Sequence, residues 1–110
     1  MQMGEEGSLL RIFIAEADQY HGKALYETIV VKARELGLAG ATVLRGIMGF
    51  GADSRVHSAK ILELSDDLPL VVEIVDTEEN LKKILPFLQD AVKDGLVTQE
   101  RVRVLKYSHS

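Results

Sequence analysis

The sequence contains no cysteine, so disulfide bonds and thiolate metal sites are excluded. It also has no excess of basic residues. The formal net charge of −4 argues against a general nucleic-acid binder, although a few local basic groups suffice to hold a small anion. No apolar run approaches the ~20 residues needed to cross a bilayer, and the acidic N-terminus lacks the basic-then-apolar order of a signal peptide. We therefore expect a cytoplasmic protein that neither binds nucleic acid nor inserts into a membrane.

The rest of the composition is that of an ordinary globular protein. Hydrophobic residues make up 46% of the chain and charged residues 27%. A chain of 110 residues is long enough to bury a core without disulfide or metal staples. We expect one domain over residues 9–107, a flexible lead over residues 1–8 and a short tail over residues 108–110.

Strand-like and helix-like patterns alternate along the chain. Runs rich in strand formers cover residues 9–16, 41–50, 70–75 and 101–107, with a further apolar stretch at 59–64. From Lys23 to Leu36 apolar residues recur at three- and four-residue spacing, which predicts an amphipathic helix. Gly37 follows at the position where a C-terminal glycine cap belongs.

A second helix is predicted before the last strand. Asp76 or Thr77 is placed to cap its N-terminus, and Leu81 to Val92 supply its apolar face. Pro86 lies inside this pattern and predicts a kink or an irregular first half. The order of elements is β-α-β-(β)-β-α-β. Two interlocking β-α-β units predict an α+β ferredoxin-like sandwich, an antiparallel sheet with both helices on one face.

The alternation within the strands bears on assembly. One side of each strand is largely apolar and suits the helices, while the opposite side carries single charges among apolar neighbours. A solvated sheet face is usually more uniformly polar. A monomer with some exposed apolar groups is one interpretation. We favour an oligomer that covers this face, with Arg11, Arg45, Glu73 and Arg103 paired in the interface.

The most distinctive stretch is a glycine-rich segment that ends the second predicted strand. It comprises Arg45, Gly46, Ile47, Met48, Gly49, Phe50 and Gly51, and a polar loop over residues 51–58 follows. The glycines match neither the dinucleotide-binding order nor a phosphate-binding loop with Gly-Lys-Ser/Thr. They indicate either a β-bulge at the shoulder of a hairpin, or a backbone that approaches a phosphate or a base closely.

Other candidate side chains are weaker. Arg101 and Arg103 lie near Gly95 at the predicted start of the last strand, where they are either interface charges or phosphate ligands. His57 lies in the polar loop, and His21 near Asp18 makes at most a partial metal site. No nucleophile–base pair or carboxylate dyad stands out, so we expect a protein that is not an enzyme.

With these motifs in place, the chain resembles the PII signalling proteins, which carry Gly-Phe-Gly at the base of their T-loop. It is identified more closely as a member of a compact PII-like family, domain-of-unknown-function family 190. The resemblance covers residues 9–107. Its motifs are Leu-Arg-Ile-Phe-Ile-Ala-Glu from Leu10, His-Gly-Lys from His21, Gly-Ala-Thr-Val from Gly40, Arg-Gly-Ile-Met-Gly-Phe-Gly from Arg45, Leu68-Pro69 and Asp-Gly-Leu-Val-Thr from Asp94.

The resemblance implies a homotrimeric regulatory protein that binds an adenine nucleotide (AMP, ADP or ATP) in clefts between subunits. Binding would order the 51–58 loop, which would then dock on a partner transporter or enzyme. The implied nucleotide-binding residues are Arg45, Gly46, Met48, Gly49, Phe50, Gly51, Gly95, Leu96, Val97, Thr98, Arg101 and Arg103. No cofactor beyond this effector is implied.

Two alternatives remain on the sequence alone. A CutA-like trimeric protein of the same fold would bind a divalent metal through His21, His57 and carboxylates. A dimeric oxygenase of ferredoxin-like fold would need a histidine or tyrosine inside a deep apolar pocket.

Overall fold

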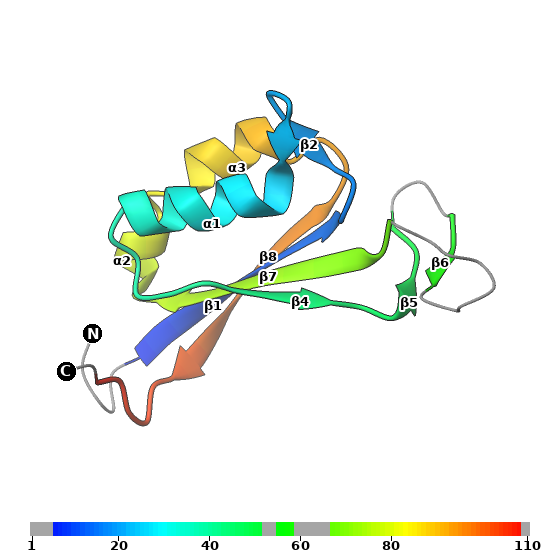
Figure 1. Ribbon diagram of the computed structural model, residues 1–110. Helices are drawn as coiled ribbons and strands as arrows, with labels where there is room; N and C mark the ends of the chain where they lie inside the picture. Colours follow the sequence, from blue (N-terminus) through cyan, green and yellow to red (C-terminus); the bar gives the residue numbers. More distant parts are fainter. Residues whose placement is uncertain (1–5, 52–54, 59–66, 109–110) are drawn as a thin grey trace.

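The chain folds as a four-stranded antiparallel sheet with its helices on one face (Figure 1). The computed structural model describes residues 6–51, 55–58 and 67–108. The sheet has the order β4-β7-β1-β8, formed by β1 (Glu6–Ala15), β4 (Thr42–Arg45), β7 (Pro69–Asp76) and β8 (Leu96–Arg103). Helices α1 (Leu25–Glu35), α2 (Glu78–Leu81) and α3 (Leu85–Ala91) cover it. This confirms the predicted ferredoxin-like α+β class.

The core lies between the sheet and the helices. Alternate residues of the two central strands point toward the helices and are buried, and the helices bury one stripe each. These core residues are Leu10, Ile12 and Ile14 of β1, Leu70, Val72 and Ile74 of β7, Leu25, Ile29 and Ala33 of α1, and Leu81, Ile84, Leu88 and Ala91 of the second helical region. The apolar spacing of two residues in the strands and of three to four residues in the helices, seen in the sequence, is therefore the spacing of the buried residues.

The C-terminus of α1 is closed as predicted. Gly37 has a φ of +74°, its N–H donates to the carbonyl of Arg34, and the N–H of Leu38 donates to the carbonyl of Ala33. These two bonds form a Schellman motif, which needs one residue in the left-handed conformation. Glycine adopts this conformation at the least cost.

A small hairpin precedes α1, where the sequence predicted only a connection. It pairs β2 (Gln19–Tyr20) with β3 (Lys23–Ala24). His21 and Gly22 have φ values of 51° and 80°, the two left-handed residues of a type I′ turn. The hairpin is tied to α3 by a hydrogen bond from the Tyr20 hydroxyl to Asp90.

The second helical region is broken in two, as Pro86 predicted. Thr77 caps α2, and its Oγ1 accepts a hydrogen bond from the N–H of Asn80 at 3.1 Å. The helix then ends at Leu81, and Pro86 occupies the first turn of α3. Proline is tolerated there because the N–H that it lacks would have no intrahelical acceptor.

Two predicted strand boundaries were wrong. The first strand begins at Glu6, so residues 6–8 belong to the sheet and not to a flexible lead. The last strand runs from Leu96 to Arg103 and not from 101 to 107, because residues 96–98 already pair with β1. Leu96 to Thr98 are therefore strand residues, and Arg101 and Arg103 lie toward the end of that strand and not at its start.

The second predicted strand is also shorter than expected. It stops at Arg45, and a separate two-stranded hairpin pairs β5 (Met48–Gly49) with β6 (His57–Ser58). This hairpin extends away from the helices, beyond the end of β4 (Figure 1). The predicted returning strand at 59–64 lies outside the described residues, as do residues 1–5, 52–54 and 109–110.

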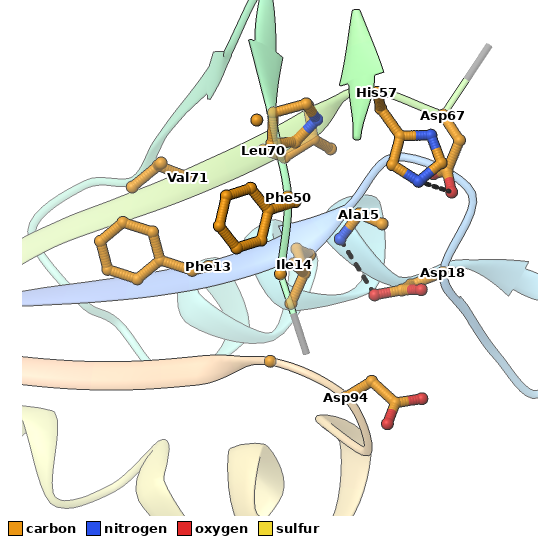
Figure 2. Close-up of a pocket in the computed structure, with 14 residues that line it drawn as sticks. Phe13, Ile14, Ala15, Asp18, Phe50, His57, Asp67, Leu70, Val71 and Asp94 are labelled. Carbon is orange, nitrogen blue, oxygen red and sulfur yellow. Dashed lines mark hydrogen bonds and ion pairs between the residues drawn. The ribbon is translucent and has the colours of Figure 1, made fainter. Parts of the chain in front are cut away.

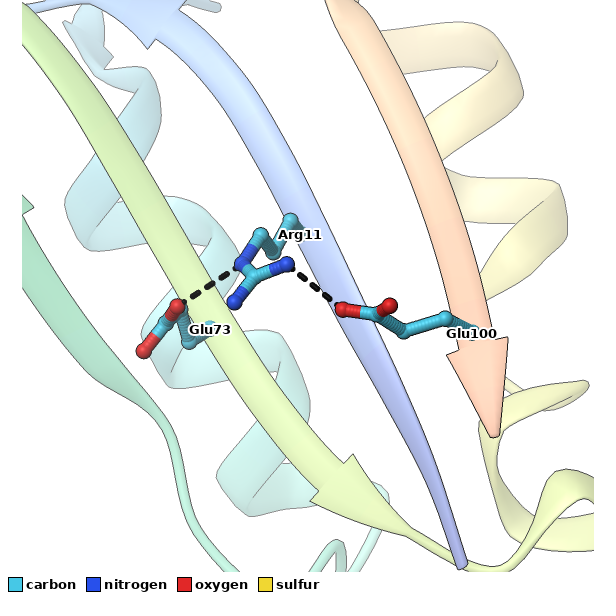
Figure 3. Close-up of polar contacts among 3 residues, drawn as sticks. All are labelled: Arg11, Glu73 and Glu100. Carbon is cyan, nitrogen blue, oxygen red and sulfur yellow. Dashed lines mark hydrogen bonds and ion pairs between the residues drawn. The ribbon is translucent and has the colours of Figure 1, made fainter. Parts of the chain in front are cut away.

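The face of the sheet opposite the helices, the open face, carries both charge and apolar surface. Arg11 bridges two carboxylates, with Nε 2.9 Å from Glu73 and Nη1 2.6 Å from Glu100 (Figure 3). The hydrogen bond to Glu73 is the main reason that the pKa of Arg11 is raised. Arg11 and Glu73, which the sequence predicted to be paired in a subunit interface, pair with each other on the open face of one chain.

Two further arginines differ from their predicted places. Arg45 forms an ion pair with Glu16 of the same chain. Arg103 is opposite Glu6 and Arg101 is opposite Ser8, so both arginines share the face that the helices cover farther along the sheet.

Within the described residues, no helix is long and apolar enough to cross a membrane.

Candidate functional site

A pocket of about 300 Å³ opens beside the β5–β6 hairpin, where β1 ends and where β7 and β8 begin. The C-terminal part of β1, the first residues of β7 and the segment before β8 form its walls, and residues 49–51 reach it from the hairpin (Figure 2). It is lined by Phe13, Ile14, Ala15, Asp18, Gly49, Phe50, Gly51, His57, Asp67, Pro69, Leu70, Val71, Asp94 and Gly95.

The glycines of the hairpin shoulder are explained by one proline. A Cβ on Gly46 would lie 2.9 Å from Cγ of Pro69, and a Cβ on Gly49 would lie 3.2 Å from the same atom. The N–H of Gly46 donates to the carbonyl of Pro69 at 2.7 Å. These two glycines therefore seat the hairpin against β7. A Cβ on Gly51 would meet nothing within 4 Å, so that glycine leaves open space at the pocket.

Gly95 is required by close packing of the backbone. A Cβ there would lie 2.5 Å from the carbonyl oxygen of Phe13 and 2.9 Å from Val92. Because a backbone oxygen cannot move aside like the end of a flexible side chain, only glycine fits where β8 begins beside β1. The same position places Asp94 and Gly95 on the wall of the pocket.

The polar side of the pocket is acidic. Asp18 accepts a hydrogen bond from the N–H of Ala15 at 3.0 Å. Asp67 accepts one from the N–H of Ala17 at 2.8 Å, and its other oxygen lies 3.9 Å from Nε2 of His57. The two carboxylates thus hold the chain that leaves β1, while His57 connects the hairpin to the same corner (Figure 2).

The structure brings only part of the predicted site together. Among the predicted residues, Gly49, Phe50, Gly51 and Gly95 line the pocket. The lining residues do not include Arg45, Gly46, Met48, Leu96, Val97, Thr98, Arg101 or Arg103.

The two arginines of β8 are far from the pocket of their own chain. Phe13 is opposite Leu96, whereas Arg101 and Arg103 are opposite Ser8 and Glu6. At about 3.3 Å per residue, five and seven positions along β1 separate them from Phe13 by roughly 17 and 23 Å. Neither arginine forms an ion pair with another described residue.

Sequence reasoning missed Phe13, Asp67 and Asp94 as pocket residues. Phe13 lies in the strand predicted at residues 9–16, and each aspartate lies in a segment that is typical of a turn or a helix end. They come from segments far apart in the chain, so no local spacing connected them. The glycine-rich segment and the Asp-Gly pair at Asp94 were the local signals that pointed to this corner of the fold.

The metal-binding alternative receives no support from the geometry. Within residues 6–51, 55–58 and 67–108, no three histidine or carboxylate side chains are grouped so that they could hold a metal ion. His21 is not among the lining residues and stacks on Tyr20, with ring centroids 4.1 Å apart.

The sequence pattern of the DUF190 family, described as "Uncharacterized ACR, COG1993", matches residues 7–104. The chain belongs to the DUF190 family. A UPF0166 protein of Aquifex aeolicus is 41% identical to this DUF190 chain over 97 residues, which is 88% of the chain and 91% of that relative. A UPF0166 protein of Methanocaldococcus jannaschii is 37% identical over 93 residues, which is 84% of the chain and 85% of that relative.

Solved structures place the DUF190 chain in the PII-like fold. CPII of Thiomonas intermedia K12 superposes with a TM-score of 0.62 and 19% identity, covering 93% of this chain and 91% of CPII. That protein was solved with ADP and bicarbonate, and a second structure of it holds ADP, AMP and bicarbonate. CPII is described as a nitrogen regulatory PII-like protein.

Proposed function

We propose that this DUF190 protein is a PII-like regulator that binds an adenine nucleotide at clefts between the subunits of a homotrimer. The observation that carries the proposal is the pocket of about 300 Å³ at the base of the β5–β6 hairpin, lined by Phe13 and Phe50. Apolar and aromatic walls with a few polar groups are typical of small-molecule sites. Support also comes from the shared fold with CPII, which was solved with ADP and AMP.

The position of the pocket favours a site between subunits. Leu44, Val71, Phe13 and Leu96 are directly opposite one another across all four strands and form an apolar row on the open face. Leu44 is 48% exposed and Leu96 57% exposed. Phe13 and Val71 of this row also line the pocket, so a subunit that covered the row would border the ligand.

A second subunit would also supply charge. In the proposed trimer, Arg101 and Arg103 of one chain reach the ligand in the pocket of the next and offset its phosphates. Nucleotide binding then acts on the loop at residues 51–58, through which the protein regulates a partner transporter or enzyme. The role is one of binding, with no catalytic step.

The test is thermal unfolding with AMP, ADP and ATP, each with and without bicarbonate, and with GTP as a control. A ligand at 100 times its dissociation constant stabilises the native state by ~2.7 kcal/mol. We expect at least one adenine nucleotide to raise the melting temperature, and Arg101→Ala or Arg103→Ala to reduce the rise. Arg34→Ala, on the exposed side of α1, should leave it unchanged. If no nucleotide moves the transition of the wild type, the proposal is wrong.

A further inference from the structure

Two ion pairs join the β5–β6 hairpin to the corner that follows β1, one on each side of the hairpin. Arg45, at the end of β4 and directly before the hairpin, pairs with Glu16. His57, on the returning strand β6, has its Nε2 3.9 Å from Oδ2 of Asp67 (Figure 2). An arginine stays charged in proteins, whereas histidine ordinarily changes its charge between pH 5 and 8. The two sides of the hairpin therefore differ in how their attachment depends on pH.

The carboxylate of Asp67 is fixed on the body of the protein. Its Oδ1 accepts a hydrogen bond from the N–H of Ala17 at 2.8 Å. The backbone beside it is also held, because the N–H of Glu16 donates to the carbonyl of Leu68 at 2.9 Å. The side chain of Asp67 is 32% exposed and that of His57 is 18% exposed, so water only partly screens the attraction between them. Asp67 is thus a fixed negative charge that faces the hairpin.

The strength of this pair depends on the protonation of the histidine. A distance of 3.9 Å is too long for a hydrogen bond, so the attraction is Coulombic and requires a protonated imidazole. The ionisable groups that line the pocket together with His57 are all carboxylates, namely Asp67 before β7, Asp18 after β1 and Asp94 before β8. The partner of His57 across the hairpin is a glycine, and Arg55 lies two positions before it on the same segment. A proton on His57 therefore meets negative charge from three other segments of the chain.

We propose that His57 and Asp67 form a proton-dependent latch, which holds the returning strand of the hairpin against the body at acidic pH and loosens as the pH rises. Protonated His57 attracts Asp67, whereas neutral His57 keeps only its packing contacts. The outgoing side stays attached in both states, since Arg45 keeps its charge and the N–H of Gly46 donates to the carbonyl of Pro69. The latch requires no ligand, so it goes beyond the proposed function and does not depend on it.

The experiment measures hydrogen exchange of the backbone N–H groups of β5 and β6 in the unliganded protein at pH 6 and pH 8. Each rate is compared with that of an unstructured chain at the same pH, which gives a protection factor that reports local opening of the hairpin. We expect the protection factor to be about threefold larger at pH 6 than at pH 8, a size typical of a partly exposed ion pair. The N–H groups of β1 that pair with β7 serve as the reference for the rest of the fold.

Two variants and one control identify the groups that form the latch. His57→Gln cannot carry the positive charge, and Asp67→Asn removes the negative charge but keeps an oxygen for the N–H of Ala17. Each variant should abolish the difference between the two pH values. His21→Asn is the control, because it removes an exposed histidine from the β2–β3 turn, where asparagine tolerates the left-handed backbone. The control should keep the difference.

Equal protection of the wild-type hairpin at both pH values would overturn the inference, as would larger protection at pH 8. A difference that survives in either His57→Gln or Asp67→Asn would assign the effect to another group and exclude the latch. Absence of protection at both pH values would show that the hairpin is not held against the body. Because every measurement uses unliganded protein, the latch and the proposed function can fail separately. Melting temperatures show whether each variant is folded.

Discussion

At the scale of single residues, Asp76 is a buried polar group that accepts three hydrogen bonds. Its side chain is 3% exposed. It accepts hydrogen bonds from the backbone N–H groups of Thr77 and Ala39, at 2.7 and 2.8 Å, and from Nδ2 of Asn80 at 3.0 Å. Burial alone would raise the pKa of Asp76, but these hydrogen bonds outweigh it and lower the pKa below its usual value.

Asp76→Ala should therefore lower the free energy of unfolding by about 1–3 kcal/mol at pH 7, since it leaves buried donors without an acceptor. The folded-state pKa lies below the ordinary value of about 3.9. The stabilisation that comes from ionisation is therefore complete above that value and is lost as the pH falls through the folded-state pKa. Urea unfolding of the wild type and Asp76→Ala, at pH 7 and at pH 3, should show the difference shrinking at the lower pH. A difference of the same size at both pH values would contradict the assignment.

Residues whose role is local could be predicted from the sequence. Thr77 and Gly37 act on backbone groups within a few positions of themselves. Helical periodicity predicted Gly37 as a C-terminal cap and narrowed the N-terminal cap of the second helix to Asp76 or Thr77, of which the structure shows Thr77. The aspartates of the pocket could not be found in this way. Asp18, Asp67 and Asp94 meet through the fold, and each also suits the turn or helix end in which it lies.

At the scale of elements, the start of β8 depends on Gly95 and the shoulder of the hairpin depends on Gly46. The sequence suggested that both glycines could approach a ligand. The structure shows that each is in close contact with another part of the chain, Gly95 with the backbone of Phe13 and Gly46 with the ring of Pro69. A pattern of glycines predicts close approach, but it does not say to what.

The two contacts predict different costs for alanine. Gly95→Ala places a methyl group against an immovable carbonyl oxygen and should destabilise the fold by about 1–3 kcal/mol. Gly46→Ala meets mainly the tip of a proline ring and should cost less. Gly40→Ala is the control, because a Cβ there meets nothing within 4 Å. Chemical unfolding of the three variants gives the order, and a Gly95→Ala variant as stable as Gly40→Ala would refute the argument.

The boundaries of β8 were mispredicted for a related reason. Leu96, Val97 and Thr98 are good strand formers, but they follow an Asp-Gly pair that is typical of a turn or a phosphate-binding loop. Pairing with Phe13, Ile12 and Arg11 of β1 decides in favour of the strand. That partner lies some 85 positions earlier in the chain (from Arg11 to Thr98 the separation is 87), so no local pattern could report it.

At the scale of the whole molecule, a substitution on the open face can distinguish a monomer from the proposed trimer. Leu44→Glu introduces a charge into the apolar row and should convert an oligomer to monomers if another subunit covers that row. Val31→Glu is the matched control, because Val31 is 53% exposed on α1, on the opposite side of the sheet. Light scattering coupled to gel filtration reports the mass of each variant.

The same variants connect assembly to the ligand. Since the row borders the pocket, Leu44→Glu should weaken adenine nucleotide binding at least tenfold together with the loss of the oligomer, whereas Val31→Glu should retain both. A Leu44→Glu protein that is monomeric and still binds with wild-type affinity would place the whole site within one chain. An unchanged oligomer would show that another surface holds the subunits together.

The contact of the β5–β6 hairpin with Pro69 has a consequence for which substitutions the hairpin tolerates. Pro69 supports both Gly46 and Gly49, so the direction in which the hairpin leaves the sheet is set at its base. A Cβ on Gly51, by contrast, would meet nothing within 4 Å. A substitution at Gly51 should therefore leave the direction of the hairpin unchanged, whereas one at Gly46 or Gly49 acts on the support itself.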